Sequence, residues 1–224
     1  MSLLFLVRHA QASFGTDDYD RLSELGLQQS RWLGEYFAER GVSFTRIVAG
    51  TLRRQRQTAQ EIAAALGIGE HAIGIDAGLD EYPGDALYAA HTGGADALAQ
   101  QRADHRDYWR TFRAAMTAWS GGQLAGVPED WDGFGSRIGE ALTRAAEGTR
   151  RDDAVLLVSS GGAIGRAVAD ITGAPASTAI ELNLQFRNTG VCELIAGGGA
   201  LRLLSYNNVP HLDRPQRRHA ITFA

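Results

Sequence analysis

A cation and an imidazole follow directly on an apolar run near the N-terminus. The run is LLFLV, residues 3–7, and Arg8 and His9 come next. A neutral imidazole is nucleophilic near physiological pH, because its unperturbed pKa is about 6.5, and a guanidinium beside it can hold phosphoryl oxygens without losing its charge. The pair is suited to the capture of a phosphoryl group. An Arg-His pair at a strand end can also be purely structural, with its hydrogen bonds made inside the fold.

A second cationic group lies in the segment RIVAGTLRRQRQTAQEI, residues 46–62. Arg53, Arg54 and Arg56 follow a short apolar run and open a segment of helical composition, and the N-terminal amides of a helix favour anions. We expect Arg54 to face the same crevice as Arg8. The alternative is that these arginines form a solvated first turn.

The elements that must position these residues alternate along the chain between β-favouring and helical patterns, which predicts a three-layer α/β/α fold with a mostly parallel central sheet. The runs LLFLV and AVLLV are continuously apolar, as in central parallel strands covered on both faces. Ligands of such sheets bind beyond the carboxyl ends of the strands, where Arg8 and His9 fall. The predicted strands are residues 3–7, 46–49, 154–158, 190–196 and 200–206, and the predicted helices are 24–40, 53–66, 131–148 and 162–172.

The middle of the chain, about residues 82–133, has a different composition. Its aromatic residues, including Trp109, Phe112, Trp119 and Trp131, are spread through polar, helix-compatible sequence. We expect a helical lid inserted into one domain that spans residues 1–224. The glycine-rich piece at 196–200 predicts a hairpin turn between the last two strands.

Composition excludes several classes of function. The formal net charge of −4 and the pI near 5.9 argue against a broad nucleic-acid or anionic-membrane surface. Cys192 is the one cysteine, so no internal disulfide or cysteine-based zinc cluster is possible. The N-terminal apolar run is too short for a signal peptide, so a cytoplasmic protein is expected, with no membrane partner. The oligomeric state is left open.

The order of five segments carries a resemblance. LVRHAQAS, DRLSELGLQQSRWLGEYF, AGTLRRQRQTAQEIA, GLDEY and VLLVSSGGAI together resemble the histidine phosphatase superfamily, which includes the cofactor-dependent phosphoglycerate mutases. The resemblance implies that His9 is the nucleophile that becomes phosphohistidine, and that Arg8 and Arg54 bind the phosphate. It implies that Glu81 is the proton donor, with Asp80 as the second choice; Glu81 can also be read as an ordinary loop carboxylate.

Two positions depart from the family pattern. Ala10 stands where the family has glycine, and it fits if its backbone avoids a strongly positive φ. Ser160 stands where the family has a second pocket histidine. Ser160 and the amide of Gly161 can donate hydrogen bonds to phosphate but bring no charge, and His211 is a candidate to compensate, although a histidine after a proline is more often structural.

The expected activity is phosphomonoester hydrolysis on a phosphorylated small molecule. Histidine itself carries the phosphoryl group, so no cofactor is expected, and the sequence shows no metal motif. The alternatives are a phosphate-ligand binding module with impaired catalysis, a mutase-type phosphotransferase, and a phosphatase acting on phosphoproteins. A mutase is less favoured because YPGDALYAAH, after Glu81, does not match the family's mutase segment.

Overall fold

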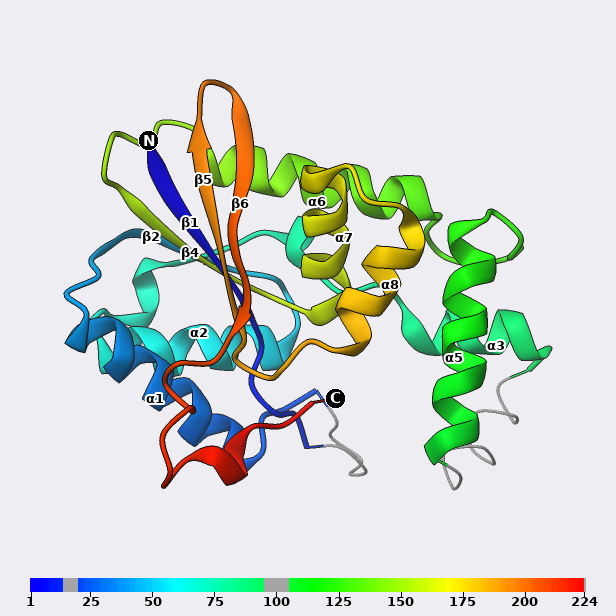
Figure 1. Cartoon of the computed structure of the whole chain (residues 1–224), viewed down its shortest axis with the longest axis horizontal. Coiled ribbons are helices and arrows are strands. Elements are labelled where there is room, and N and C mark those ends of the chain that lie inside the picture. The colour runs from blue at the N-terminus through cyan, green and yellow to red at the C-terminus, as the bar shows by residue number, and fades with distance from the viewer. Residues whose placement is uncertain (14–19, 95–104, 224) are drawn as a thin grey trace.

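A six-stranded sheet forms the centre of the computed structural model, which describes residues 1–13, 20–94 and 105–223 (Figure 1). The strand order is β3-β2-β4-β1-β5-β6. The first four strands are parallel, β5 is antiparallel to β1, and β6 is antiparallel to β5. The predicted mostly parallel sheet is confirmed. The strands are β1 (Ser2–Arg8), β2 (Phe44–Ala49), β3 (Ile73–Ile75), β4 (Ala154–Ser159), β5 (Val191–Gly197) and β6 (Ala200–Asn208).

Helices cover both faces of this sheet, which confirms the three-layer prediction. Helices α1 and α2 lie on one face, and α6 and α7 lie on the other (Figure 1). Helix α8 packs on α7, and α5 contacts both α3 and α8. The helices are α1 (Glu24–Glu39), α2 (Arg53–Ala65), α3 (Gly84–Thr92), α5 (His105–Ser120), α6 (Trp131–Ala146), α7 (Gly161–Thr172) and α8 (Ala176–Leu184).

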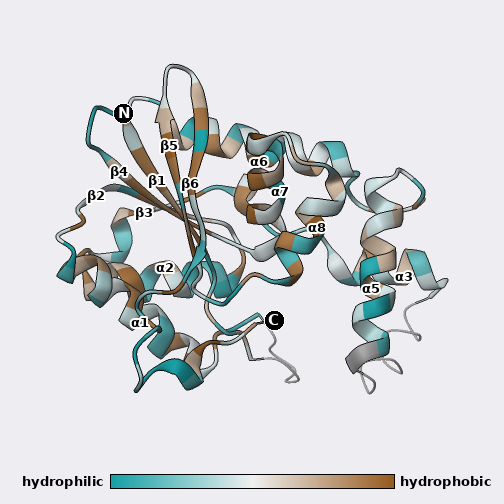
Figure 2. Ribbon diagram, in the orientation of Figure 1, coloured by the Kyte–Doolittle hydropathy of each residue, from teal (hydrophilic) through white to brown (hydrophobic). Residues whose placement is uncertain are grey.

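Alternating side chains of β1 supply the two halves of the core. Leu4 and Leu6 pack with the residues of α6 and α7, whereas Phe5 and Val7 pack with those of α1 and α2. All four are at most 7% exposed. Burial of each such side chain contributes about 1.5–3 kcal/mol, so the continuously apolar run is explained by a strand with two covered faces. In Figure 2 the central strands are largely brown, the colour of apolar residues, whereas the helices around them carry both brown and teal residues.

The parallel register brings three strand ends to one edge of the sheet. Arg8 of β1 pairs with Ser159 of β4, and Ala49 of β2 pairs with Val158. Beyond these ends, the amide of His9 donates to the carbonyl of Ser159 at 2.8 Å. The segments that follow β1, β2 and β4 therefore leave the sheet side by side.

Helices α3 and α5 carry most of the aromatic residues of the middle segment, Trp109, Phe112 and Trp119 among them, and lie beside the three layers, at the right of Figure 1. The rings of Tyr88 and Tyr108 stack at 5.3 Å, which joins the two helices. Residues 95–104, part of the predicted insertion, lie outside the described residues. In the part of the chain that is described, no helix has both the length and the apolar character required to cross a membrane.

The predicted hairpin turn joins β5 to β6. Gly198 and Gly199 have φ of 62° and 77°, and a two-residue turn with positive φ at both positions matches the twist of the flanking strands. Glycine adopts this conformation without steric cost.

Candidate active site

A cavity of about 520 Å³ opens at the carboxyl edge of the parallel strands. It brings together Arg8, His9, Arg54 and Glu81, which come from three separate parts of the sequence. The remaining lining residues belong to the segment that opens α3, to α5 and to the end of α8: Tyr82, Pro83, Gly84, Asp85, Ala86, Tyr108, Trp109, Phe112, Asn183 and Leu184.

The imidazole of His9 is held through both ring nitrogens. Its Nε2 accepts a hydrogen bond from Arg54 Nε at 3.1 Å, and its Nδ1 lies 2.8 Å from the carbonyl oxygen of Ala10. Because a guanidinium can only donate, Nε2 is the unprotonated nitrogen and Nδ1–H donates to the carbonyl. Burial lowers the pKa of His9 well below its usual value, and the charges of Arg54 and Arg8 lower it further. His9 is therefore a neutral imidazole whose Nε2 lone pair is available for attack.

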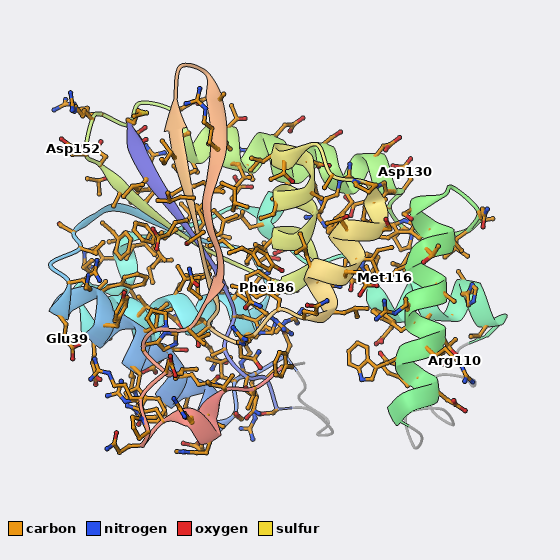
Figure 3. The ribbon with its side chains drawn as sticks, in the orientation of Figure 1. Glu39, Arg110, Met116, Asp130, Asp152 and Phe186 are labelled. Atoms are coloured by element: carbon orange, nitrogen blue, oxygen red, sulfur yellow. The ribbon has the colours of Figure 1, made fainter. Side chains whose placement is uncertain are left out.

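Two arginines surround this histidine. Arg54 lies in the first turn of α2, and its Nη1 is 2.5 Å from Oδ1 of Asp20. Arg8 is 6% exposed, and its Nη1 donates to the carbonyl of Phe186, a residue labelled in Figure 3. Arg53 is exposed, so the arginine cluster divides between the cavity and solvent. The expectation that Arg54 shares a crevice with Arg8 agrees with this geometry.

Glu81 reaches the same cavity from the loop before α3. Its Oε2 accepts from the amide of Gly162 at 2.9 Å, near the start of α7. Burial raises the pKa of Glu81, although the amides of Gly162 and Tyr82 and the charge of Arg54 oppose the rise. A carboxyl with a raised pKa keeps its proton to higher pH, which is what a general acid requires. Asp80, the second choice, instead accepts from the amide of Thr51 at 2.6 Å and does not line the cavity.

Ser160 and Gly161 occupy the predicted place after β4, but neither lines the cavity. Ser160 is fully buried, and its Oγ accepts from Gln55 Nε2 at 2.9 Å. Gly161 is the first residue of α7, and a Cβ there would lie 2.8 Å from Asn183 Oδ1. The same Cβ would lie 3.5 Å from Arg8 Nε, so Gly161 is next to that arginine, and hydrogen bonds from Ser160 and Gly161 to a phosphate stay a prediction.

The structure does not bring His211 to the cavity. His211 is fully buried, and its Nε2 lies 2.8 Å from Thr189 Oγ1. The amide of Thr189 contacts the carbonyl of His9, so His211 supports the backbone behind the nucleophile and cannot replace a charge in front of it. Ala10 is fully buried and is not among the non-glycine residues with positive φ, so alanine fits this position without strain.

Sequence reasoning missed four residues that shape the site: Asp20, Tyr82, Gly162 and Asn183. A Cβ on Gly162 would lie 2.4 Å from Glu81 Oε1 and 2.1 Å from Tyr82 Cε1, so a glycine is required for their close approach. Asn183 Nδ2 donates to the hydroxyl of Tyr82 at 2.8 Å. The Tyr82 hydroxyl lies 3.6 Å from the sulfur of Met116, which is labelled between α5 and α8 in Figure 3. The one signal visible in the sequence was Gly162 itself, the last residue of the SSGG segment.

A three-layer α/β fold with histidine, two arginines and a glutamate at the carboxyl edge defines a phosphoryl-transfer class of site. The chain belongs to the histidine phosphatase superfamily, branch 1, whose family model matches residues 4–209. The family predicted from the sequence is thus confirmed.

Curated relatives and solved structures share this fold along nearly the whole chain. A probable phosphoglycerate mutase GpmB of Enterobacter sp. (strain 638) is 29% identical over 238 residues, which cover 97% of this chain and 100% of that protein. A phosphoserine phosphatase from Entamoeba histolytica, in complex with 3-phosphoglyceric acid, has a TM-score of 0.65 at 21% identity and covers 95% of this chain and 100% of its own. The alpha-ribazole phosphatase of Shigella flexneri has a TM-score of 0.64 at 18% identity, with 92% and 96% covered. These structural likenesses support the fold.

Proposed function

We propose that this protein hydrolyses phosphomonoesters of small molecules through a phosphohistidine intermediate on His9. One observation carries the proposal: the Nε2 lone pair of a neutral His9 lies in the same cavity as Arg8, Arg54 and Glu81. A volume of about 520 Å³ is in the range of small-molecule sites.

In the first step, His9 Nε2 attacks phosphorus and the bond from phosphorus to the ester oxygen breaks. Arg8 and Arg54 hold the phosphoryl oxygens. As Nε2 becomes bonded to phosphorus, the Nε–H of Arg54 keeps its proton and changes its hydrogen-bond acceptor from the imidazole to a phosphoryl oxygen. The departing alkoxide takes the carboxyl proton of Glu81. The Nδ1–H continues to donate to the carbonyl of Ala10, and this hydrogen bond stabilises the positive charge of the phosphorylated ring.

In the second step, water attacks the phosphohistidine. Glu81, now a carboxylate, takes a proton from that water, and the bond from phosphorus to Nε2 breaks. The products are inorganic phosphate and His9 with its Nε2 lone pair restored. The raised pKa of Glu81 favours the return of its proton for the next turnover.

The replacement of the family histidine by Ser160 lowers the expected rate. A positively charged donor aimed at the transition state is worth about 3 kcal/mol, or about a hundredfold in rate, by analogy with a lost oxyanion donor. Ser160 is neutral and is not among the residues that line the cavity, so it does not replace a positively charged donor. A slower phosphatase is expected.

Hydrolysis is favoured over mutase chemistry by the composition of the cavity. A mutase must retain a doubly phosphorylated intermediate in two orientations, which requires cations for a second phosphate. Among the described residues that line the cavity, Arg8 and Arg54 are the only arginines, and lysine is absent from them. The similar proteins include one described as a probable mutase and others described as phosphatases, so similarity does not choose between the two activities. The small number of cations in the cavity supports hydrolysis.

The test is phosphate release from an aryl phosphate by wild type, His9→Ala and His71→Ala, with folding of each checked by circular dichroism. His71 is exposed and lies outside the cavity, so its variant is the matched control. Release by wild type and His71→Ala, with loss in His9→Ala, supports the proposal, as does a phosphohistidine trapped at alkaline pH. Equal release by His9→Ala would refute it, and binding of phosphate without any turnover would favour a binding module.

A further inference from the structure

The cavity wall next to the phosphoryl site is aromatic. Tyr82, Tyr108, Trp109 and Phe112 all line it. Tyr82 and Phe112 are at most 7% exposed, whereas Tyr108 and Trp109 are partly exposed. The first two therefore form a buried base, and the other two extend the wall toward solvent.

Contacts between the rings fix the orientation of this wall. Phe112 stacks on Tyr108 at 5.8 Å and meets Trp109 edge to face at 5.7 Å. Tyr82 lies 6.2 Å from Phe112, and its hydroxyl accepts from Asn183. Rings held in this way lose little conformational freedom when another ring packs on them.

The chain connects this wall directly to the proposed proton donor. Glu81 protonates the oxygen of the leaving group in the mechanism above, and Tyr82 and Pro83 follow it in sequence and in the lining of the cavity. An alcohol whose oxygen lies at Glu81 must therefore extend its body along the residues that follow. The nature of those residues determines which alcohols are bound.

Resting on the proposed function, we propose that the preferred substrates are phosphate monoesters of alcohols that carry an aromatic ring, and that Tyr108 and Trp109 determine this specificity. Pairs of aromatic rings gain more than area burial alone, so the wall favours a planar ring over an aliphatic body of similar size. The cavity offers such a ring stacking and edge contacts from residues already held in place.

Phosphorylated carboxylic acids fit this cavity less well. Such compounds carry a second anionic group, which needs a cation of its own once desolvated. In the described part of the lining, the guanidinium groups of Arg8 and Arg54 lie beside His9 and are required for the phosphoryl group. A carboxylate on the leaving group would face aromatic carbon instead.

The test compares 2-phenylethyl, 2-cyclohexylethyl and ethyl phosphate with 3-phosphoglycerate by kcat/KM. The first three are esters of primary alcohols, so their intrinsic reactivity is similar and differences report binding of the body. For wild type, we expect kcat/KM for 2-phenylethyl phosphate to be at least tenfold higher than for ethyl phosphate and about threefold higher than for 2-cyclohexylethyl phosphate. The value for 3-phosphoglycerate should be lower than all three.

Trp109→Leu tests whether the aromatic wall determines the preference for aromatic esters, because leucine has a high helix propensity in α5 and removes the ring. The ratio of 2-phenylethyl to ethyl phosphate is expected to fall at least fivefold. Trp32→Leu is the matched control, since Trp32 packs near Val209 and Leu212, outside the cavity, and its ratio should equal that of wild type. If Trp109→Leu does not fold, the wild-type ratios decide.

The outcomes separate this inference from the function on which it rests. Equal kcat/KM for ethyl and 2-phenylethyl phosphate, or a preference for 3-phosphoglycerate, would overturn the aromatic preference and leave the phosphatase intact. Parity of the phenyl and cyclohexyl esters would also overturn it, because the wall would then recognise only apolar area. Absence of hydrolysis of every ester would overturn both proposals.

Discussion

Arg54 Nε donates to His9 Nε2 across 3.1 Å, and this contact determines the protonation state of the proposed nucleophile. The donor leaves Nε2 without a proton and places the ring proton on Nδ1, where the carbonyl of Ala10 accepts it. The same guanidinium lowers the pKa of His9, adding to the effect of burial. One side chain therefore orients the imidazole and helps to keep it neutral, and in the proposed mechanism it also binds the phosphoryl group.

The opposite pKa shifts of His9 and Glu81 predict the pH dependence of turnover. The pKa of His9 is lowered, so loss of activity by protonation of the nucleophile is expected well below pH 6.5. Burial raises the pKa of Glu81 above its ordinary value of 4.5, so kcat/KM for alkyl phosphates falls as the pH rises through this raised pKa and the proton is lost. Glu81→Gln should lower kcat/KM at pH 5.5 by about 10²–10⁴.

The measurement is the ratio of wild-type to Glu81→Gln kcat/KM from pH 4.5 to 8. Ionisation of the substrate affects both enzymes equally and cancels in this ratio. We expect the ratio to decrease with rising pH, and to be smaller for an aryl phosphate, whose leaving group needs little protonation. A ratio that is constant with pH would show that Glu81 is not the proton donor.

Asp20 is predicted to position Arg54. Its Oδ1 lies 2.5 Å from Arg54 Nη1, and its Oδ2 accepts from the amide of Arg53 at 2.8 Å. Asp20→Asn keeps the size of the side chain and removes the charge that directs the guanidinium, so kcat should fall about tenfold. Asp213→Asn is the control, because Asp213 pairs with exposed Arg218 at 3.5 Å.

A positioning role also changes the pH profile. With Arg54 held less firmly, its charge acts less on His9, so the acid limb of kcat/KM should move toward higher pH in Asp20→Asn. Unchanged kcat and an unchanged acid limb would count against this role, and a loss of folding in urea titration would assign Asp20 to stability alone.

Local patterns in the sequence were sufficient for strands β1, β2, β4, β5 and β6 and for three of the residues that meet at the cavity. The apolar runs before His9 and after Asp153 predict covered parallel strands, and the carboxyl-end rule then places Arg8, His9 and Arg54 at one edge. Glu81 followed from the family resemblance. The five strands and the three residues Arg8, His9 and Arg54 depend on interactions close in sequence or on a general property of parallel sheets.

The residues that sequence reasoning missed depend on contacts between distant segments. Strand β3 has three residues and pairs with β2 at the edge, so its pattern is too short to identify. Helix α8 is nine residues long, and only its packing on α7 brings Asn183 to Tyr82. The similarity of the segment SYNNVPHL to the family's C-terminal segment suggests His211 as a pocket residue, but tertiary packing directs its Nε2 to Thr189.

Gly162→Ala is predicted to impair catalysis and stability together. The added Cβ would lie 2.4 Å from Glu81 Oε1 and 2.1 Å from a carbon of the Tyr82 ring, so Glu81 must move from the amide of residue 162. We expect about a hundredfold loss of kcat/KM for ethyl phosphate and about 1–3 kcal/mol lower free energy of unfolding. Enzyme assays and urea titration measure the two effects.

Gly139→Ala is the matched control for this substitution. Gly139 is exposed within α6, and a Cβ there meets no atom within 4 Å. Alanine should stabilise this helix by about 0.5–1 kcal/mol without any change in kcat/KM. Full activity in Gly162→Ala would show that the position of Glu81 against α7 is not required for proton donation.

His211 predicts a loss of stability in acid. Burial lowers its pKa from 6.5 to about 3, and the charge of Arg217 adds to the shift. Because the folded state holds this histidine neutral, its stabilising contribution is fully present above pH 6.5 and is lost as the pH falls toward about 3. The slope from one such group is at most about 1.4 kcal/mol per pH unit.

His211→Gln can still donate to Thr189 but cannot titrate, so its free energy of unfolding should fall less between pH 6.5 and pH 4.5 than that of wild type. Urea titrations at the two pH values measure this difference, with His71→Gln, at an exposed position, as the control that should follow wild type. Parallel pH dependence of wild type and His211→Gln would mean that His211 is not held neutral by the fold.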